Sequence, residues 1–86
     1  MTQLSGPEEV EEKIVLRAMS RDASLDEEVA RLLAGKVLDE VGAGVDPTDA
    51  PELARRLLAA EPVAGASLAS IVAAAASEVL EEATTS

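Results

Sequence analysis

Residues 67–80 read SLASIVAAAASEVL and carry the most informative pattern in the chain. Their larger apolar side chains recur at intervals of three and four residues, which is the period of an α-helix with one apolar face. Most of the other positions are alanine, whose small side chain lets two helices approach closely. We predict a helix capped by Ser67 that lies either inside a bundle or across a subunit interface. Its apolar stripe is formed by Leu68, Ile71, Val72, Ala75, Val79 and Leu80.

Upstream, the sequence predicts two longer helices. The first covers about residues 7–20, where four glutamates between positions 8 and 12 lie near the positive end of the helix dipole. The second begins at Ser24, because Glu27 three residues later completes a capping box. It ends at the Gly-Ala-Gly sequence of residues 42–44, since glycine commonly follows the last helical turn.

A third, shorter helix is predicted over residues 51–60. Asp46 and Asp49 in the preceding turn are candidates for its cap, and Pro62 ends it, because a residue before proline leaves helical geometry. No segment alternates between apolar and polar residues as a half-buried strand would. Because the connections are short, successive helices should pack antiparallel. We predict an all-α fold, a small and approximately up-down four-helix bundle that self-association could complete. Its expected parts are a flexible N-terminus at 1–6, one helical domain at 7–83 and a frayed end at 84–86.

The composition indicates a thin core. The chain has 86 residues, 48% of them hydrophobic, but no Phe, Trp or Tyr. Aromatic side chains bury the largest area per residue, so their absence limits the stabilisation that burial provides. We therefore expect help from a homo-oligomer, with a dimer favoured, or from another protein.

Charge and residue inventory narrow the possible functions. The net charge of −10 repels nucleic acids and anionic membrane surfaces. The chain has no His and no Cys, so it lacks the usual zinc ligands and thiol nucleophiles, and we expect no metal, cofactor or catalytic residue. Helix dipoles and solvation explain the acidic clusters near the helix starts. The pair Glu81 and Glu82 lies where the dipole disfavours negative charge, so it is either a solubilising pair or part of a surface that meets a basic partner. With no export leader and no apolar stretch of membrane-spanning length, we expect a cytoplasmic protein.

Two short segments are similar to the attachment site of phosphopantetheine carrier proteins, in which a modified serine follows aspartate at the start of a helix. They are the sequences Asp-Ala-Ser-Leu at 22–25 and Gly-Ala-Ser-Leu at 65–68. In both, alanine stands directly before the serine, where the carriers have aspartate. This resemblance implies an acyl or peptidyl carrier modified on Ser24 or Ser67, an alternative function. A small acidic enzyme subunit that contributes carboxylates is a more remote one.

The function that the sequence favours is a non-catalytic protein–protein interaction module, acting as an adaptor, a docking domain or a regulatory accessory subunit. Apolar helix faces would contact the partner, and the acidic rim would select a partner with a basic or apolar docking surface. The adjacent basic pair at 55–56 could contribute, because arginine is enriched at binding hot spots. The candidate interface residues are Leu33, Val37, Arg55, Arg56, Leu68, Ile71, Val72, Ala75 and Val79.

Overall fold

In the computed structural model, which describes residues 7–85, the chain folds into four α-helices and one short 3₁₀ helix. These elements are α1 (Pro7–Arg21), α2 (Glu27–Gly42), α3 (Ala50–Ala60), η1 (Pro62–Ala64) and α4 (Ala66–Thr85). The described part of the chain contains no strand, so the all-α four-helix prediction is confirmed. The expected flexible N-terminus at 1–6 lies outside the described residues, and α4 extends past residue 83 to Thr85.

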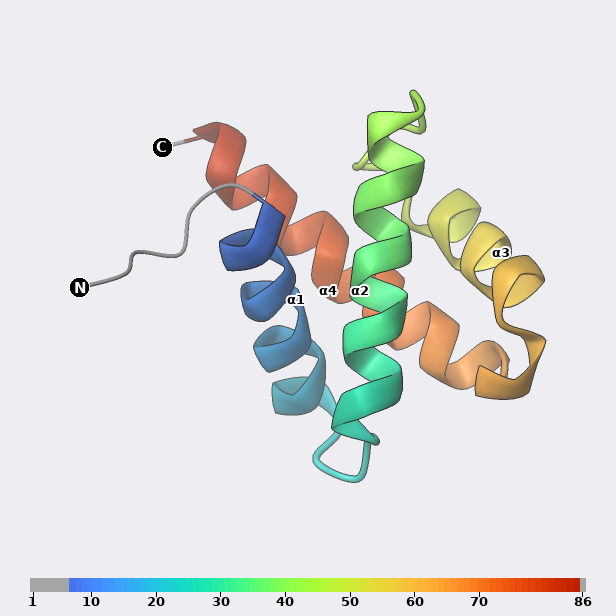
Figure 1. Ribbon diagram of the computed structural model, residues 1–86. Coiled ribbons are helices and arrows are strands. Elements are labelled where there is room, and N and C mark those ends of the chain that lie inside the picture. Colours follow the sequence, from blue (N-terminus) through green and yellow to red (C-terminus); the bar gives the residue numbers. More distant parts are fainter. Residues whose placement is uncertain (1–6, 86) are drawn as a thin grey trace.

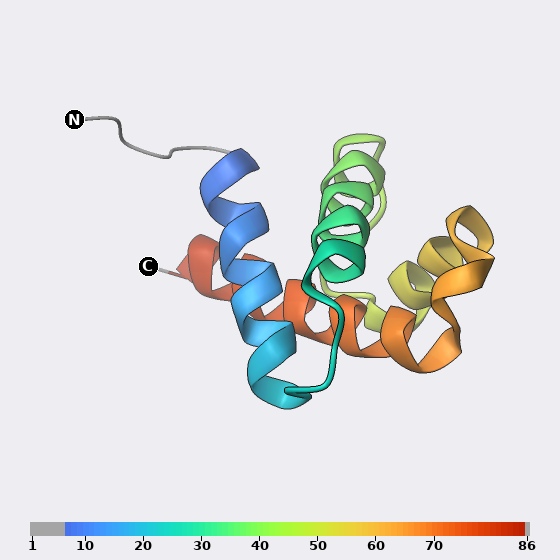
Figure 2. The ribbon, with the colours of Figure 1, turned by 60° about the horizontal axis from the view of Figure 1, so that its bottom comes forward.

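The four helices form two layers (Figures 1 and 2). Helices α1 and α2 lie side by side and run in opposite directions, and α3 lies on the far side of α2. Helix α4 runs obliquely across the other three and contacts each of them. The bundle therefore has a central crossing helix in place of four rods aligned along one axis.

The core is aliphatic and rich in alanine. Fifteen hydrophobic residues are buried among the described side chains, and six of them belong to α4. Four of these six are alanines, which leave the backbone of α4 close to its neighbours. The sequence of residues 67–80 therefore produces the central helix of the monomer. The α4 core residues are Ala69, Val72, Ala73, Ala75, Ala76 and Val79.

The N-terminus of α2 differs from the predicted capping box. The cap is Asp26, whose carboxylate accepts hydrogen bonds from the backbone N–H groups of Glu28 at 2.9 Å and Val29 at 3.4 Å. Ser24 instead belongs to the preceding turn, where its backbone N–H and hydroxyl both donate to Asp22. The prediction for Ser24 was wrong because two aspartates flank it: Asp22 holds it in the turn, and Asp26 takes the capping position.

Replacing Asp26 by alanine is expected to destabilise the fold by about 1 kcal/mol, the usual loss when an N-cap is removed. Chemical unfolding followed by far-ultraviolet circular dichroism measures this change. Ser24→Ala is the matched control, because Ser24 lies in the same turn without capping the helix. A larger loss for Ser24→Ala than for Asp26→Ala would contradict the assignment of the cap.

An aspartate precedes α3 and a glycine precedes α4. Asp49 caps α3 by accepting a hydrogen bond from the backbone N–H of Glu52, which confirms one of the two predicted candidates. Helix α4 begins at Ala66, so Ser67 lies inside its first turn and is not its cap. The residue before α4 is Gly65, with a φ of 90°, a conformation that glycine adopts without strain. This glycine turns the chain from η1 into α4.

Candidate functional site

Most of the apolar residues that the sequence suggested for an interface are used inside the monomer. Five of them are buried in the common core, namely Leu33, Val37, Val72, Ala75 and Val79. Leu68 and Ile71 are half-buried and pack against that core. These residues stabilise the fold and present little surface to a second molecule, so an interaction site must be sought elsewhere.

The basic pair on α3 is exposed, but intramolecular ion pairs hold it. Arg55 donates to Glu52 at 2.6 Å, and Arg56 donates to the same carboxylate at 2.8 Å. Arg56 also reaches Glu40 on α2 at 3.1 Å. The hydrogen bonds from Arg55 and then Arg56 lower the pKa of Glu52 below its ordinary value. The two arginines therefore join α3 to α2, and their charges are balanced by Glu52 and Glu40.

Glu52→Gln is expected to make the fold less sensitive to acid. A carboxyl whose folded pKa is lowered stabilises the fold above its ordinary pKa and loses that contribution as the pH falls through its folded value. The melting temperature should therefore fall less in the variant than in the wild type between about pH 5 and about pH 2. Thermal unfolding followed by circular dichroism at a series of pH values compares the two. An equal fall in both would show that the Glu52 cluster contributes nothing.

The two serines of the carrier-like segments lie on the surface in different settings. Ser24 sits in the turn between α1 and α2, where its hydroxyl lies 2.6 Å from a carboxylate oxygen of Asp22. Ser67 is exposed in the first turn of α4, which contains no acidic residue. Neither serine therefore stands at the start of a helix with an acidic first turn.

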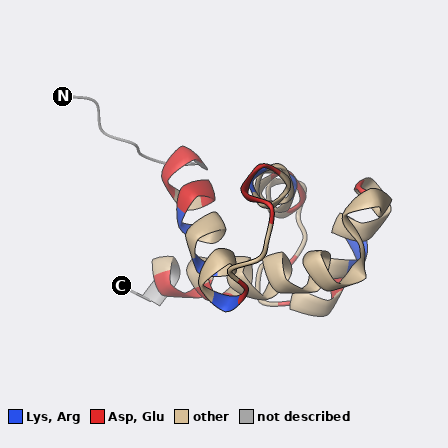
Figure 3. Ribbon diagram, turned by 90° about the horizontal axis from the view of Figure 1, so that it is seen from below, with Lys and Arg blue, Asp and Glu red and all other residues tan. Residues whose placement is uncertain are grey.

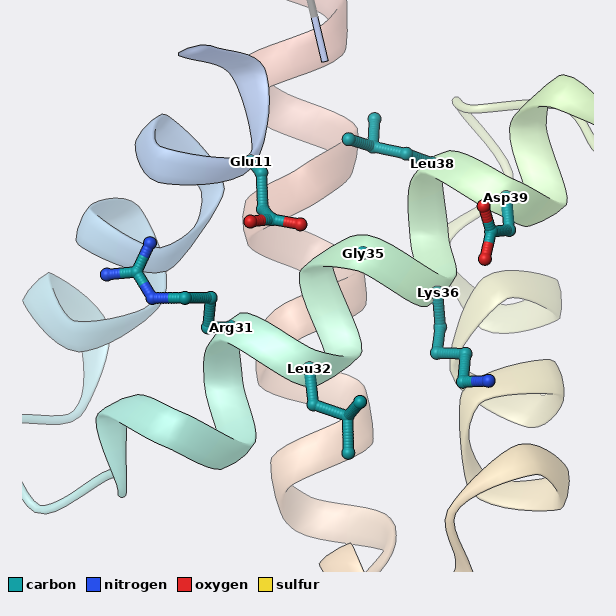
Figure 4. Close-up of a pocket in the computed structure, with 7 residues that line it drawn as sticks. All are labelled: Glu11, Arg31, Leu32, Gly35, Lys36, Leu38 and Asp39. Carbon is teal, nitrogen blue, oxygen red and sulfur yellow. The ribbon is translucent and has the colours of Figure 1, made fainter. Parts of the chain in front are cut away.

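The two exposed leucines of the described chain each lie in a shallow groove, whereas the exposed Val63 lies in neither. The first is a groove of about 370 Å³ along the outer face of α2, which we call the α2 groove. Leu32 projects from it with 47% of its surface exposed, and Leu38 is half-buried at its other end. The close-up in Figure 4 shows Gly35 at the centre of this face, with no side chain above the backbone. The groove is lined by Glu11, Arg31, Leu32, Gly35, Lys36, Leu38 and Asp39.

The second groove, of about 360 Å³, lies between α1 and α4 and contains Leu16, which is 59% exposed. Ion pairs near this groove join the two helices. Arg17 donates to Glu78 at 3.0 Å and to Glu82 at 2.9 Å, and Arg21 also pairs with Glu78. Hydrogen bonding to Arg17 lowers the pKa of Glu82. These ion pairs hold α1 on α4 beside the groove.

The grooves differ in charge from the rest of the molecule. Four of the seven basic residues line them, but only three of the seventeen acidic residues do. Figure 3 shows acidic residues at the beginning of α1 and α2 and near the end of α4. The exposed leucines therefore lie where the surface is close to neutral, although the chain carries −10 overall.

Three charged side chains of the α2 groove have no ion pair or hydrogen bond within the described chain, namely Glu11 from α1 and Lys36 and Asp39 from α2. Figure 4 shows Glu11 and Lys36 on opposite sides of Gly35. A Cβ atom on Gly35 would lie 3.0 Å from Oε2 of Glu11, so this carboxylate rests directly over the glycine. The neighbouring Arg31 is already paired with Glu12 at 2.6 Å and with Glu27 at 2.8 Å.

No family model, curated protein or solved structure matches this chain. Its function must therefore be inferred from its own surface. Over residues 7–85, no group of three or more acidic side chains is arranged to hold a metal ion. In the same region, every buried side-chain nitrogen or oxygen has a hydrogen-bond partner. None of the described helices is both long and apolar enough to span a bilayer.

Proposed function

We propose that this chain is a non-catalytic protein–protein interaction module that binds a helix of its partner in the α2 groove. The observation that carries the proposal is the combination of exposed Leu32 with unpaired side chains of both charges, Glu11, Lys36 and Asp39, around one glycine. We also propose a cytoplasmic location. Small secreted domains commonly depend on disulfides, and this chain has no cysteine to form one.

The apolar part of the groove suits a helix. A single exposed leucine is common on soluble proteins and has no meaning by itself. Here, Leu32 lies beside a glycine whose missing side chain lets another backbone approach, and half-buried Leu38 adds apolar surface about one turn beyond that glycine. An amphipathic helix laid into such a groove would cover both leucines.

The charged part of the groove supplies specificity. Glu11 and Lys36 are partly exposed and have no ion pair in the free chain, and each would gain one from a partner with complementary charges in the same places. The groove between α1 and α4 offers less, because Arg17 and Glu82 already satisfy each other. For this reason we place the binding site on α2 and not beside Leu16.

Photo-crosslinking tests this function. A photoreactive amino acid is placed at position 32, inside the groove, and separately at position 70, an exposed serine of α4 outside both grooves. We expect position 32 to give a discrete protein adduct after irradiation in the source cells, and position 70 to give none. No adduct from position 32, or equal adducts from both positions, would contradict the proposal.

A further inference from the structure

We infer that the occupant of the α2 groove is α2 of a second copy of this chain, so that the protein forms a parallel twofold dimer. This inference rests on the proposed function, because it names the partner of the same groove. It can fail independently: in the photo-crosslinking experiment, an adduct between the chain and a different protein would leave the interaction module standing and overturn the dimer.

Charge favours a second copy over a basic partner. The lining of the α2 groove contains two cations and two carboxylates, so it is neutral on a chain of net charge −10. A strongly basic partner would be attracted to the acidic surfaces elsewhere and would gain nothing from a neutral lining. Two identical neutral linings can meet without net charge repulsion, although a twofold axis along α2 brings the two copies of Asp39 to one level, whereas most other orientations of two copies oppose acidic surfaces. Electrostatic repulsion between two copies is therefore expected to be smallest when their α2 grooves face each other.

The positions of Glu11 and Lys36 select the parallel arrangement. Both lie at the level of Gly35, on opposite sides of the outer face of α2 (Figure 4). A twofold axis running along α2 exchanges these two sides, so that Glu11 of each copy meets Lys36 of the other. A twofold axis perpendicular to α2 keeps each side opposite its own counterpart, which would oppose two Glu11 carboxylates and two Lys36 ammonium groups. Only the parallel arrangement forms two ion pairs, and both are identical.

Gly35 allows the crossing itself. The distance between two packed helices depends on the side chains at their point of contact. At Gly35 the only atom near the missing side chain is the tip of Glu11, a flexible group that can move toward Lys36 of the second copy. The two backbones can then approach closely enough for the leucines on either side of Gly35 to be covered.

Charge reversal provides the decisive test. In sedimentation velocity up to about 1 mM protein, the wild type is expected to dimerise. Glu11→Lys and Lys36→Glu each replace two attractive contacts by two repulsive ones, so each alone should weaken the dimer by at least about tenfold. Mixing the two variants restores opposite charges at both contacts and should yield a heterodimer with close to wild-type affinity. The double variant, with both charges exchanged, should also dimerise.

Lys13→Glu is the matched control, because it changes the net charge by the same amount as Lys36→Glu but lies in the groove between α1 and α4. It should leave dimerisation unchanged. A wild type that remains monomeric, single variants that dimerise normally, or a mixture that stays monomeric would each overturn the inference. In an antiparallel pair, Lys36 faces Lys36 of the second copy, and Lys36→Glu would replace this repulsion between two cations by one between two carboxylates. Unchanged association of this variant would therefore indicate the antiparallel arrangement.

Gly35→Gln separates folding from association. Glutamine favours helix far more than glycine does, so the melting temperature should not fall and is expected to rise by about 3 °C. The added side chain occupies the crossing point, so dimerisation should be weakened by at least about tenfold. Circular dichroism and sedimentation on the same sample give both quantities. A stable variant that still dimerises like the wild type would place the contact away from Gly35.

Discussion

Leu57→Ala is expected to leave a large fraction of the protein unfolded at room temperature. Leu57 is one of the two fully buried leucines of α3, and α3 packs directly against α4. Truncating a buried leucine to alanine destabilises a protein by about 2–5 kcal/mol, because apolar contacts are lost and a cavity remains. A core in a chain of this size supplies little more than about 3–5 kcal/mol, so this one change removes most of the margin.

Urea unfolding followed by circular dichroism measures the effect of Leu57→Ala, since the chain has no aromatic residue for fluorescence. Leu32→Ala is the matched control, because Leu32 is 47% exposed and makes no contribution to the buried core. The control should lose less than about 1 kcal/mol at a concentration where the chain is monomeric. Equal losses at the two positions would mean that the core is assigned incorrectly.

Ala73→Leu is expected to have the second largest effect, a destabilisation of about 1–3 kcal/mol. Ala73 has no exposed surface and lies on α4, the helix that contacts all three others. Leucine raises the hydrophobicity of the position, so a protein whose core had spare room would become more stable. Where α4 crosses its neighbours, we expect the added carbon atoms to force the helices apart instead.

Ala83→Leu makes the same chemical change on the exposed surface of α4 and is the control for Ala73→Leu. Its free energy of unfolding should stay within about 0.5 kcal/mol of the wild type. If Ala73→Leu were as stable as the wild type, the alanines of α4 would not be needed for close packing, and the crossing geometry would have another cause.

The number of helices and most of their boundaries could be predicted because local signals determine them. Apolar spacing identified every helix, and Pro62 and the glycines near residue 42 marked where two of them end. The start of α2 was misplaced by competing caps: Ser24 and Asp26 both have the chemistry of a cap, and only the course of the turn decides between them. The oblique path of α4 had no local signal, because alanines on several of its faces allow many crossing angles.

The candidate site was harder to predict than the fold. In the pair Leu32–Leu33, only one side chain can face the core, and which one does so depends on where α1 and α4 pack. The sequence suggested Leu33 for the interface, whereas Leu33 is buried and Leu32 is exposed. The approach of Glu11 to Gly35 joins two different helices, so no periodicity within one helix could reveal it.

The order of the helices along the chain has a consequence for protein synthesis. Translation produces α1, α2 and α3 before α4, the helix that packs against all three. Until α4 emerges, α3 lacks the neighbour with which it makes its most extensive contact, and its buried leucines are more accessible to chaperones and proteases. A message that stops before residue 66 should therefore yield a polypeptide that is degraded, and the four-helix bundle can be completed only after α4 has left the ribosome.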